Sequence, residues 1–146
     1  TGRSSVLYKK LVDNKKMALQ AGAINLSQED YGTYILYGLP QGDTELKDII
    51  AEVDAEILKM QTELISEKDF QKLQNQFENN FVNSNSSVEG IANSLARYYM
   101  LYGDTDLINS EIEIYRSITR EEIRDVAKKY LNPNQRLLLE YLPEAK

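Results

Sequence analysis

The chain has 146 residues, a formal net charge of −6, 42% apolar and 27% charged residues, and neither histidine nor cysteine. Without imidazole or thiol groups it cannot by itself be a histidine-ligated zinc enzyme, a His- or Cys-dependent hydrolase, a disulfide scaffold or a thiolate metal site. Its acidic balance argues against binding a nucleic-acid backbone, and no apolar run approaches the ~20 residues that cross a bilayer.

The N-terminal part of the chain predicts one helix followed by a β-hairpin. Apolar residues at helical spacing indicate a helix from about residue 4 to 14, begun by Ser4 or Ser5. The period then changes to two, which predicts strands over residues 17–25 and 30–38. Because the polar connection between them is short, we expect the two strands to pair antiparallel.

Five further helices and one more strand are expected in the rest of the chain. The helix starts are indicated by Ser66, Ser87 and the capping box Thr119-Arg120-Glu121-Glu122, and Gly103 is suited to a left-handed helix end. The expected helices cover about residues 46–60, 67–82, 88–102, 107–115 and 120–130, with a polar break at residues 83–87. The apolar run at residues 136–142, which Pro143 ends, predicts a buried strand in the same sheet as the hairpin.

This order of elements predicts an α+β fold: a two-layer sandwich with a small, mainly antiparallel sheet packed against several helices. No repeat or flexible linker divides the sequence, so we expect residues 1–146 to form a single domain. The chain opens without Met and enters apolar periodicity at once, which predicts a segment of a longer polypeptide. Three strands are few for such a sheet, so a further strand is expected upstream of Thr1. The composition is compatible with either cytoplasm or periplasm.

The sequence predicts no catalytic residue and no metal ligand. The acidic residues of the helix at 46–60 and the basic residues near the N-terminus are interpreted as solvated helix faces. The glycines are scattered and form no phosphate-binding loop. Ten tyrosines are the unusual feature, and two groups of three could line a peptide-binding cleft, although packing between helix and sheet is the preferred interpretation. The acidic residues are Glu52, Asp54, Glu56 and Glu63, and the basic residues are Lys9, Lys10, Lys15 and Lys16. The two tyrosine groups are Tyr31, Tyr34 and Tyr37 in a predicted strand and Tyr98, Tyr99 and Tyr102 in a predicted helix.

Several segments, in the right order along nearly the whole chain, resemble the C-terminal type of domain in the insulinase-like (pitrilysin) zinc metallopeptidases. These segments are Gly2-Arg3-Ser4-Ser5-Val6-Leu7-Tyr8, Asp30-Tyr31-Gly32-Thr33-Tyr34, Ile65-Ser66-Glu67-Lys68-Asp69-Phe70, Ala96-Arg97-Tyr98 with Tyr102-Gly103-Asp104, Ile118-Thr119-Arg120-Glu121-Glu122-Ile123, and Ala127-Lys128-Lys129-Tyr130-Leu131.

The resemblance implies a chamber for unfolded peptides, built from paired homologous domains, with an inverted His-x-x-Glu-His zinc motif on a different domain. It implies no cofactor in this chain, zinc in another domain, and two kinds of partner: homologous peptidase domains of the same or another subunit, and peptide substrates. In one half of such enzymes this helix–strand unit carries a substrate-contacting Arg and Tyr. The matching positions are Val12 and Leu19, which cannot hydrogen-bond a substrate, so we expect both to be buried in the core.

The leading interpretation is therefore a non-catalytic, chamber-forming domain of a bacterial-type zinc metalloendopeptidase. A second interpretation is a peptide-binding or scaffold subunit whose parent has lost the zinc motif. A third is an unrelated α+β interaction module.

Overall fold

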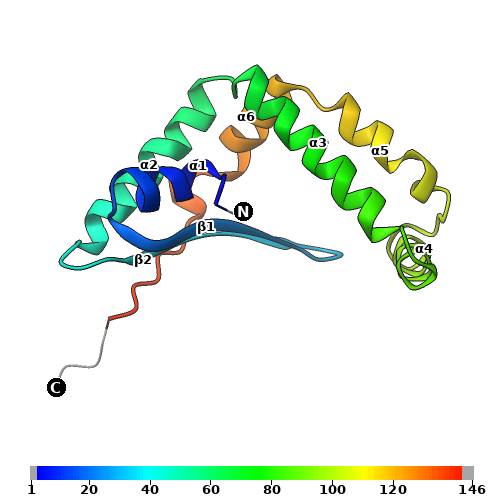
Figure 1. The fold of residues 1–146 in the computed structure, drawn as a ribbon, viewed down its shortest axis with the longest axis horizontal. Coiled ribbons are helices and arrows are strands. Elements are labelled where there is room, and N and C mark those ends of the chain that lie inside the picture. Colours follow the sequence, from blue (N-terminus) through cyan, green and yellow to red (C-terminus); the bar gives the residue numbers. More distant parts are fainter. Residues whose placement is uncertain (1–2, 143–146) are drawn as a thin grey trace. The chain divides into compact units, whose positions relative to one another are not determined.

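The computed structural model describes residues 3–142, which form two compact units. The first unit holds the described residues up to Thr62 together with those from Ala127 onward, and the second is Glu63–Val126. Figure 1 shows the hairpin and its helices in the first unit and a set of helices in the second. Along residues 3–142, no helix has both the length and the apolar character needed to cross a bilayer.

The N-terminal helix consists of a short α-helix, α1 (Val6–Tyr8), that continues as a π-helix, η1 (Lys9–Asn14). Ser5 begins it, since its hydroxyl accepts a hydrogen bond from the Tyr8 amide at 3.4 Å. The wider π-turn shows in the bond from the Lys15 amide to the Lys10 carbonyl, five residues back, at 3.0 Å. The predicted helix is thus confirmed, with a wider second half than its sequence indicated.

Strands β1 (Ala18–Ser27) and β2 (Gly32–Pro40) form the predicted antiparallel hairpin. The turn is closed by a hydrogen bond of 2.9 Å from the Gln28 amide to the Tyr31 carbonyl. Near its start, β1 contains an irregularity between Ala18 and Gln20, where Leu19 has no partner in the ladder. Such a β-bulge shifts the inward and outward alternation of the strand by one residue.

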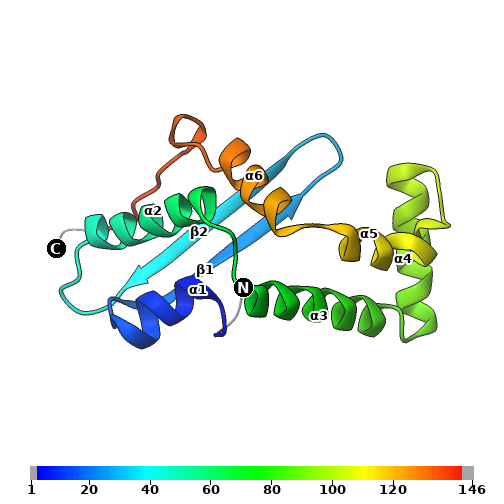
Figure 2. The ribbon, with the colours of Figure 1, turned by 90° about the horizontal axis from the view of Figure 1, so that it is seen from above.

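The core of the first unit lies between this hairpin and the helices above it. Leu11, Ala18, Ala21 and Ile49 are buried at its centre, and Leu7, Val12, Met17 and Val53 pack around them. Ile49 belongs to α2 (Leu46–Thr62). Gly38 lets α2 approach the sheet closely, because a Cβ at Gly38 would lie 2.9 Å from Ile49 Cγ2. Figure 2 shows α1 on the β1 side of the hairpin and α2 on the β2 side.

The last segments of the chain join the first unit through α2. The Gln61 side chain donates hydrogen bonds to the carbonyls of Ala127 and Leu131, at 3.3 and 2.8 Å, at the end of α6 (Arg120–Tyr130). After the 3-10 turn η2 (Pro133–Gln135), Arg136 pairs with Asp54 of α2.

The predicted third strand at residues 136–142 does not form. This segment pairs with neither β1 nor β2, and its three consecutive leucines, Leu137–Leu139, are exposed. A strand exists only when a neighbouring strand satisfies its backbone groups, so an apolar run alone does not create one.

The second unit is helical, with α3 (Glu67–Ser84), α4 (Val88–Tyr102) and α5 (Leu107–Ser117) followed by the start of α6. The predicted helices are confirmed, although α3 continues to Ser84, inside the predicted polar break, and α5 continues to Ser117. Ser66 and Ser87 cap α3 and α4 with hydrogen bonds of 3.1 and 3.0 Å from the amides of Asp69 and Gly90. Gly103 ends α4 at φ 68°, which a residue with a Cβ adopts only with strain.

Contacts between these helices involve aromatic and charged side chains rather than a buried core. Phe77 stacks on Tyr115 with ring centroids 4.6 Å apart, and Arg116 pairs with Glu78 at 2.6 Å. No residue of Glu63–Val126 is buried. Taken with the hairpin under its helices, these elements confirm the predicted α+β sandwich with a small antiparallel sheet.

Candidate functional site

The pairing register sorts the hairpin side chains between two faces of the sheet. Directly paired residues share a face in an antiparallel sheet, and consecutive residues alternate. Ala21 and Gly38 are paired and face α2, since Ala21 is part of the core and Gly38 approaches Ile49. The opposite face, called the outer face below, carries the pairs Gln20–Leu39, Gly22–Tyr37, Ile24–Ile35 and Leu26–Thr33.

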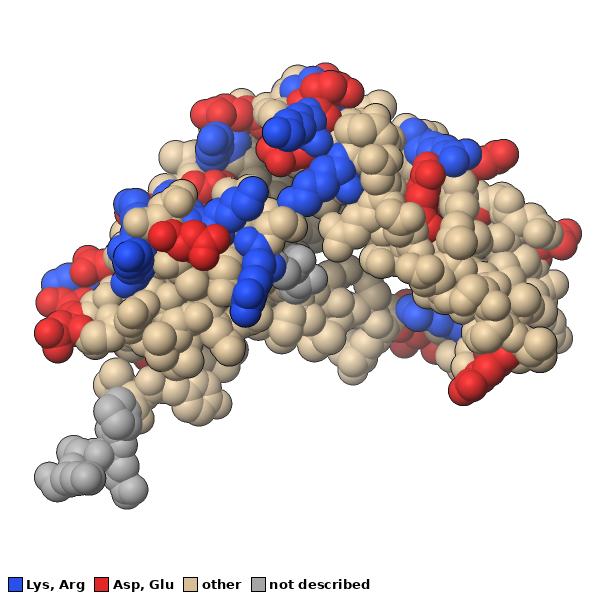
Figure 3. Space-filling model, in the orientation of Figure 1, with Lys and Arg blue, Asp and Glu red and all other residues tan. Residues whose placement is uncertain are grey.

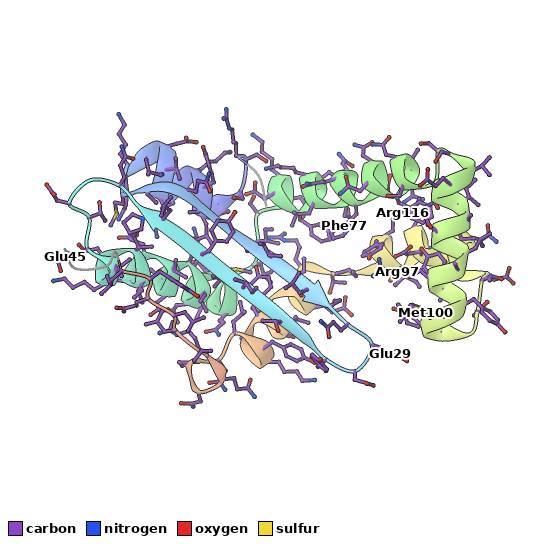
Figure 4. All side chains as sticks on the ribbon, turned by 90° about the horizontal axis from the view of Figure 1, so that it is seen from below. Glu29, Glu45, Phe77, Arg97, Met100 and Arg116 are labelled. Atoms are coloured by element: carbon purple, nitrogen blue, oxygen red, sulfur yellow. The ribbon has the colours of Figure 1, made fainter. Side chains whose placement is uncertain are left out.

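The outer face is apolar and open to solvent. Its five large apolar side chains are between 37% and 51% exposed, and they are Ile24, Leu26, Ile35, Tyr37 and Leu39. Figure 4 looks onto this face, and no helix of the first unit covers it. A monomeric protein rarely exposes a continuous apolar patch of this kind unless something binds there.

None of the paired strand residues that the structure places on the outer face is charged. The labelled acids nearest to it in the sequence, Glu29 and Glu45, lie beyond the two ends of the hairpin in Figure 4. In Figure 3 the charged side chains of the first unit gather over its helices, and the lower rim at the level of the hairpin is largely uncharged. The face therefore offers apolar area, one tyrosine hydroxyl, one threonine hydroxyl and one amide, without net charge.

A hollow of about 430 Å³ opens beside the bulge in β1. Six residues from the start of the chain and from both strands line it: Arg3, Tyr8, Leu19, Gln20, Ala21 and Tyr37. The Tyr37 ring lies across its partner Gly22, where an added Cβ would be 2.9 Å from the Tyr37 hydroxyl. Gly22 therefore leaves room for the ring of Tyr37, which is also one of the residues that line the hollow.

Val12 and Leu19 lie in different surroundings. These are the positions that the resemblance matches to a substrate-contacting Arg and Tyr. Val12, in η1, is half-buried and packs against the core, close to the expected burial. Leu19 is 54% exposed and lines the hollow, so the expectation that it is buried is wrong. The bulge is the reason, because it places Ala18 and Ala21 in the core and leaves Leu19 between them outside.

The basic and acidic residues interpreted as solvated helix faces are in part joined to each other. Lys10 contacts Glu52 and Glu56 at 2.9 and 2.7 Å, and Lys15 also pairs with Glu52. Hydrogen bonds from Lys15 and Lys10 hold the pKa of Glu52 below its usual range. Burial alone lowers the pKa of Lys10, but the hydrogen bonds and charges of Glu56 and Glu52 outweigh it and raise that pKa. This cluster fastens η1 to α2 and is structural.

The tyrosines of α4 do not pack between helix and sheet as expected. Tyr99 and Tyr102 are 69% and 66% exposed on the second unit. Tyr98 instead donates a hydrogen bond to Glu111 of α5. Burial first, and then the charge and hydrogen bond of Glu111, raise the pKa of Tyr115 on the same helix. The polar contact between α4 and α5 is the hydrogen bond of Tyr98 to Glu111.

The described residues offer no constellation for catalysis. With neither histidine nor cysteine in the sequence, acid–base and nucleophilic chemistry would rest on carboxylates and tyrosines alone. Along residues 3–142, no group of three or more carboxylates is placed to hold a metal ion. What the described residues present instead is an exposed apolar face of the sheet with a hollow beside it.

Sequence reasoning did not identify the outer-face residues Ile24, Leu26, Ile35 and Leu39. A signal for them exists, because residues 33–39 are apolar or aromatic at nearly every position of β2. A strand with apolar side chains on both faces is typical of a sheet covered on both faces.

The sequence of residues 1–77 matches the family described as "Peptidase M16 inactive domain". Among solved structures, an inactive peptidase domain from Bordetella parapertussis is similar, with a TM-score of 0.84, 18% identity, and coverage of 100% of this chain and 77% of that one. No curated protein sequence matches this chain.

Two longer proteases contain the same fold. A protease from Helicobacter pylori is similar with a TM-score of 0.82, 21% identity and coverage of 92% of this chain, which spans 32% of that protease. The periplasmic protease PqqL from Escherichia coli is similar with a TM-score of 0.68 and 17% identity, over 86% of this chain and 14% of that one. At these identities the likeness shows the fold.

Proposed function

Because this chain belongs to the Peptidase M16 inactive-domain family, we propose that it is a non-catalytic domain that helps enclose peptide substrate in the chamber of a zinc metalloendopeptidase. The zinc ligands belong to another domain of a longer protein, since this chain has no histidine or cysteine to supply. The proposal of a longer, multidomain protein is supported by the 32% of the Helicobacter pylori protease that the chain spans.

The uncharged, apolar outer face is the observation that carries this proposal. An unfolded peptide presents apolar side chains and backbone groups without a fixed shape. A flat wall of Ile24, Ile35 and Leu39 can contact many such sequences through burial of apolar area. Because the wall carries no charge, it does not select one charged peptide sequence over another.

The second unit supports a packing role against a homologous peptidase domain. Val88, Tyr99 and Met100 of α4 are 87%, 69% and 72% exposed, although all three are apolar or aromatic. A helical unit with no buried residue and with such exposed side chains gains stability when another domain covers it. We assign this cover to a domain of the same fold, in the same chain or in a partner subunit.

A pair of matched substitutions tests the wall. Ile24→Lys places a charge on the outer face, whereas Leu58→Lys places the same charge on α2, where Leu58 is also exposed. An NMR titration with an unfolded, leucine-rich peptide measures the dissociation constant of each variant. We expect Ile24→Lys to weaken binding at least about fivefold, since a desolvated ammonium opposes apolar contact, and Leu58→Lys to leave it unchanged.

Equal weakening by both substitutions, or none by either, contradicts the assignment of the wall to the outer face. If the longer protein binds peptide on this face but does not cleave it, it is a peptide-binding or scaffold subunit and not a metallopeptidase. If chelation abolishes cleavage, the metallopeptidase is supported.

A further inference from the structure

We infer that the hollow beside the bulge in β1 binds a carboxylate group of a peptide lying on the outer face. This inference rests on the proposed function only for the nature of the ligand as a peptide. The expectation that the hollow binds an anion rests on its lining residues and on the positive charge of Arg3 among them.

Arg3 gives the hollow its charge. Within residues 3–142 its guanidinium has no carboxylate partner, although the chain has a net charge of −6 and most of its other arginines are paired. None of the described residues that line the hollow is acidic. A cationic group left without an internal counterion, in a concave and otherwise neutral site, attracts an anion from outside.

The other polar groups around the hollow are hydrogen-bond donors of the kind that a carboxylate accepts. Tyr8, Tyr37 and Gln20, whose side chains carry hydroxyl and amide donors, line it together with Arg3. A guanidinium pairs with a carboxylate through two parallel hydrogen bonds, and hydroxyl and amide groups satisfy the remaining lone pairs. A cationic ligand would meet the charge of Arg3, so the donor set favours the carboxylate.

The hollow joins the outer face through two shared side chains. Gln20 and Tyr37 lie on the outer face by their register and also line the hollow. A volume of about 430 Å³ accommodates one or two peptide residues. A peptide along the outer face therefore places its apolar side chains on the sheet and can bring a carboxylate to Arg3.

Three forms of one short, N-acetylated, leucine-rich peptide test this inference on the whole chain by NMR titration. The first ends in a free carboxylate, the second in a carboxamide, and the third in a carboxamide with glutamate as its last residue. We expect the free acid to bind the wild-type protein at least about tenfold more tightly than the amide, as for loss of one charge-assisted hydrogen-bond pair. The glutamate peptide shows whether the hollow accepts a side-chain carboxylate as well as the carboxylate of a chain terminus. Tighter binding of either carboxylate peptide than of the plain carboxamide supports the inference.

The variant Arg3→Gln should remove the preference for the acid while leaving the amide affinity unchanged. Lys9→Gln is the matched control, because Lys9 is an exposed lysine of the same segment that does not line the hollow, and it should keep the preference. Tyr37→Phe, which removes one donor, should reduce the preference in part. Unchanged melting curves confirm that each variant folds.

The possible results separate this inference from the proposed function. Equal affinity of all three peptides for the wild type, or a preference for a carboxylate peptide that survives Arg3→Gln, overturns the carboxylate site and leaves the wall intact. Binding of the acid together with undetectable binding of the amide overturns the apolar wall and retains the hollow. Failure of all three peptides to bind contradicts both.

Discussion

Two leucines that look alike in sequence should differ sharply in what they contribute to stability. Leu11 is fully buried at 0% exposure in the small core of the first unit, so Leu11→Ala leaves a cavity and should cost about 2–5 kcal/mol. Leu19 is 54% exposed and lies at the bulge. Full burial of a leucine side chain contributes about 1.5–3 kcal/mol to the free energy of unfolding. Because Leu19 is only about half buried, Leu19→Ala should lower that free energy by about 1 kcal/mol.

Urea unfolding followed by far-UV circular dichroism measures both costs. When variant and wild type have the same m-value, which is the dependence of the unfolding free energy on urea concentration, a shift of the urea midpoint reports a change in the free energy of unfolding. A cost for Leu19→Ala that equals or exceeds that of Leu11→Ala would refute the placement of Leu19 outside the core, and with it the bulge. A cost below about 1 kcal/mol for Leu11→Ala would refute the core itself.

Three further predictions concern the N-terminal cap of α6, the packing of Tyr37 beside the hollow, and the absence of metal ligands. The Thr119 amide and then its hydroxyl hydrogen-bond the Glu122 carboxylate and lower its pKa, so Thr119→Ala should raise the pKa of Glu122 in an NMR titration. Because the folded pKa is depressed, the stability it contributes is present above the unfolded pKa and is lost as the pH falls through the folded value. The difference between the urea midpoints of wild type and variant should therefore narrow at low pH, and the part that remains reports the lost hydrogen bond from the Glu122 amide to the Thr119 hydroxyl. Gly22→Ala should displace the flexible Tyr37 ring, visible as a shift of its aromatic signals, at a stability cost below about 1 kcal/mol. After dialysis the chain should retain no stoichiometric zinc by elemental analysis and should cleave no fluorogenic peptide, since it has neither histidine nor cysteine; chelator-sensitive cleavage would contradict this.

Features that depend on local sequence were predictable. Ser66 and Ser87 cap their helices, Gly103 ends α4 in the left-handed region, and Thr119 with Glu122 forms the capping box, because each device involves residues within one helical turn. The hairpin followed from the change of period and from its short turn. The family resemblance rested on these same local segments in order, and the matching family covers residues 1–77.

Features that depend on distant contacts were not predictable. The ladder position of Leu19 is set by the pairing of β1 with β2, and a single bulge reverses which side chains enter the core. Residues 136–142 carry a strand-like pattern, yet they form no ladder with the hairpin. The ion pairs of Lys10 with Glu52 and Glu56 join residues more than forty positions apart, a pairing that no local pattern indicates.

Photo-crosslinking tests most directly the claim that the outer face contacts peptide. A benzophenone amino acid replaces Ile24 on the outer face or, in the control, Leu58 on α2, and each protein is irradiated with the same labelled, unfolded peptide. The account predicts a crosslinked product from position 24 that an excess of unlabelled peptide suppresses, and little or none from position 58. Crosslinking from position 58 at the same yield, or none from position 24 at saturating peptide, would contradict it.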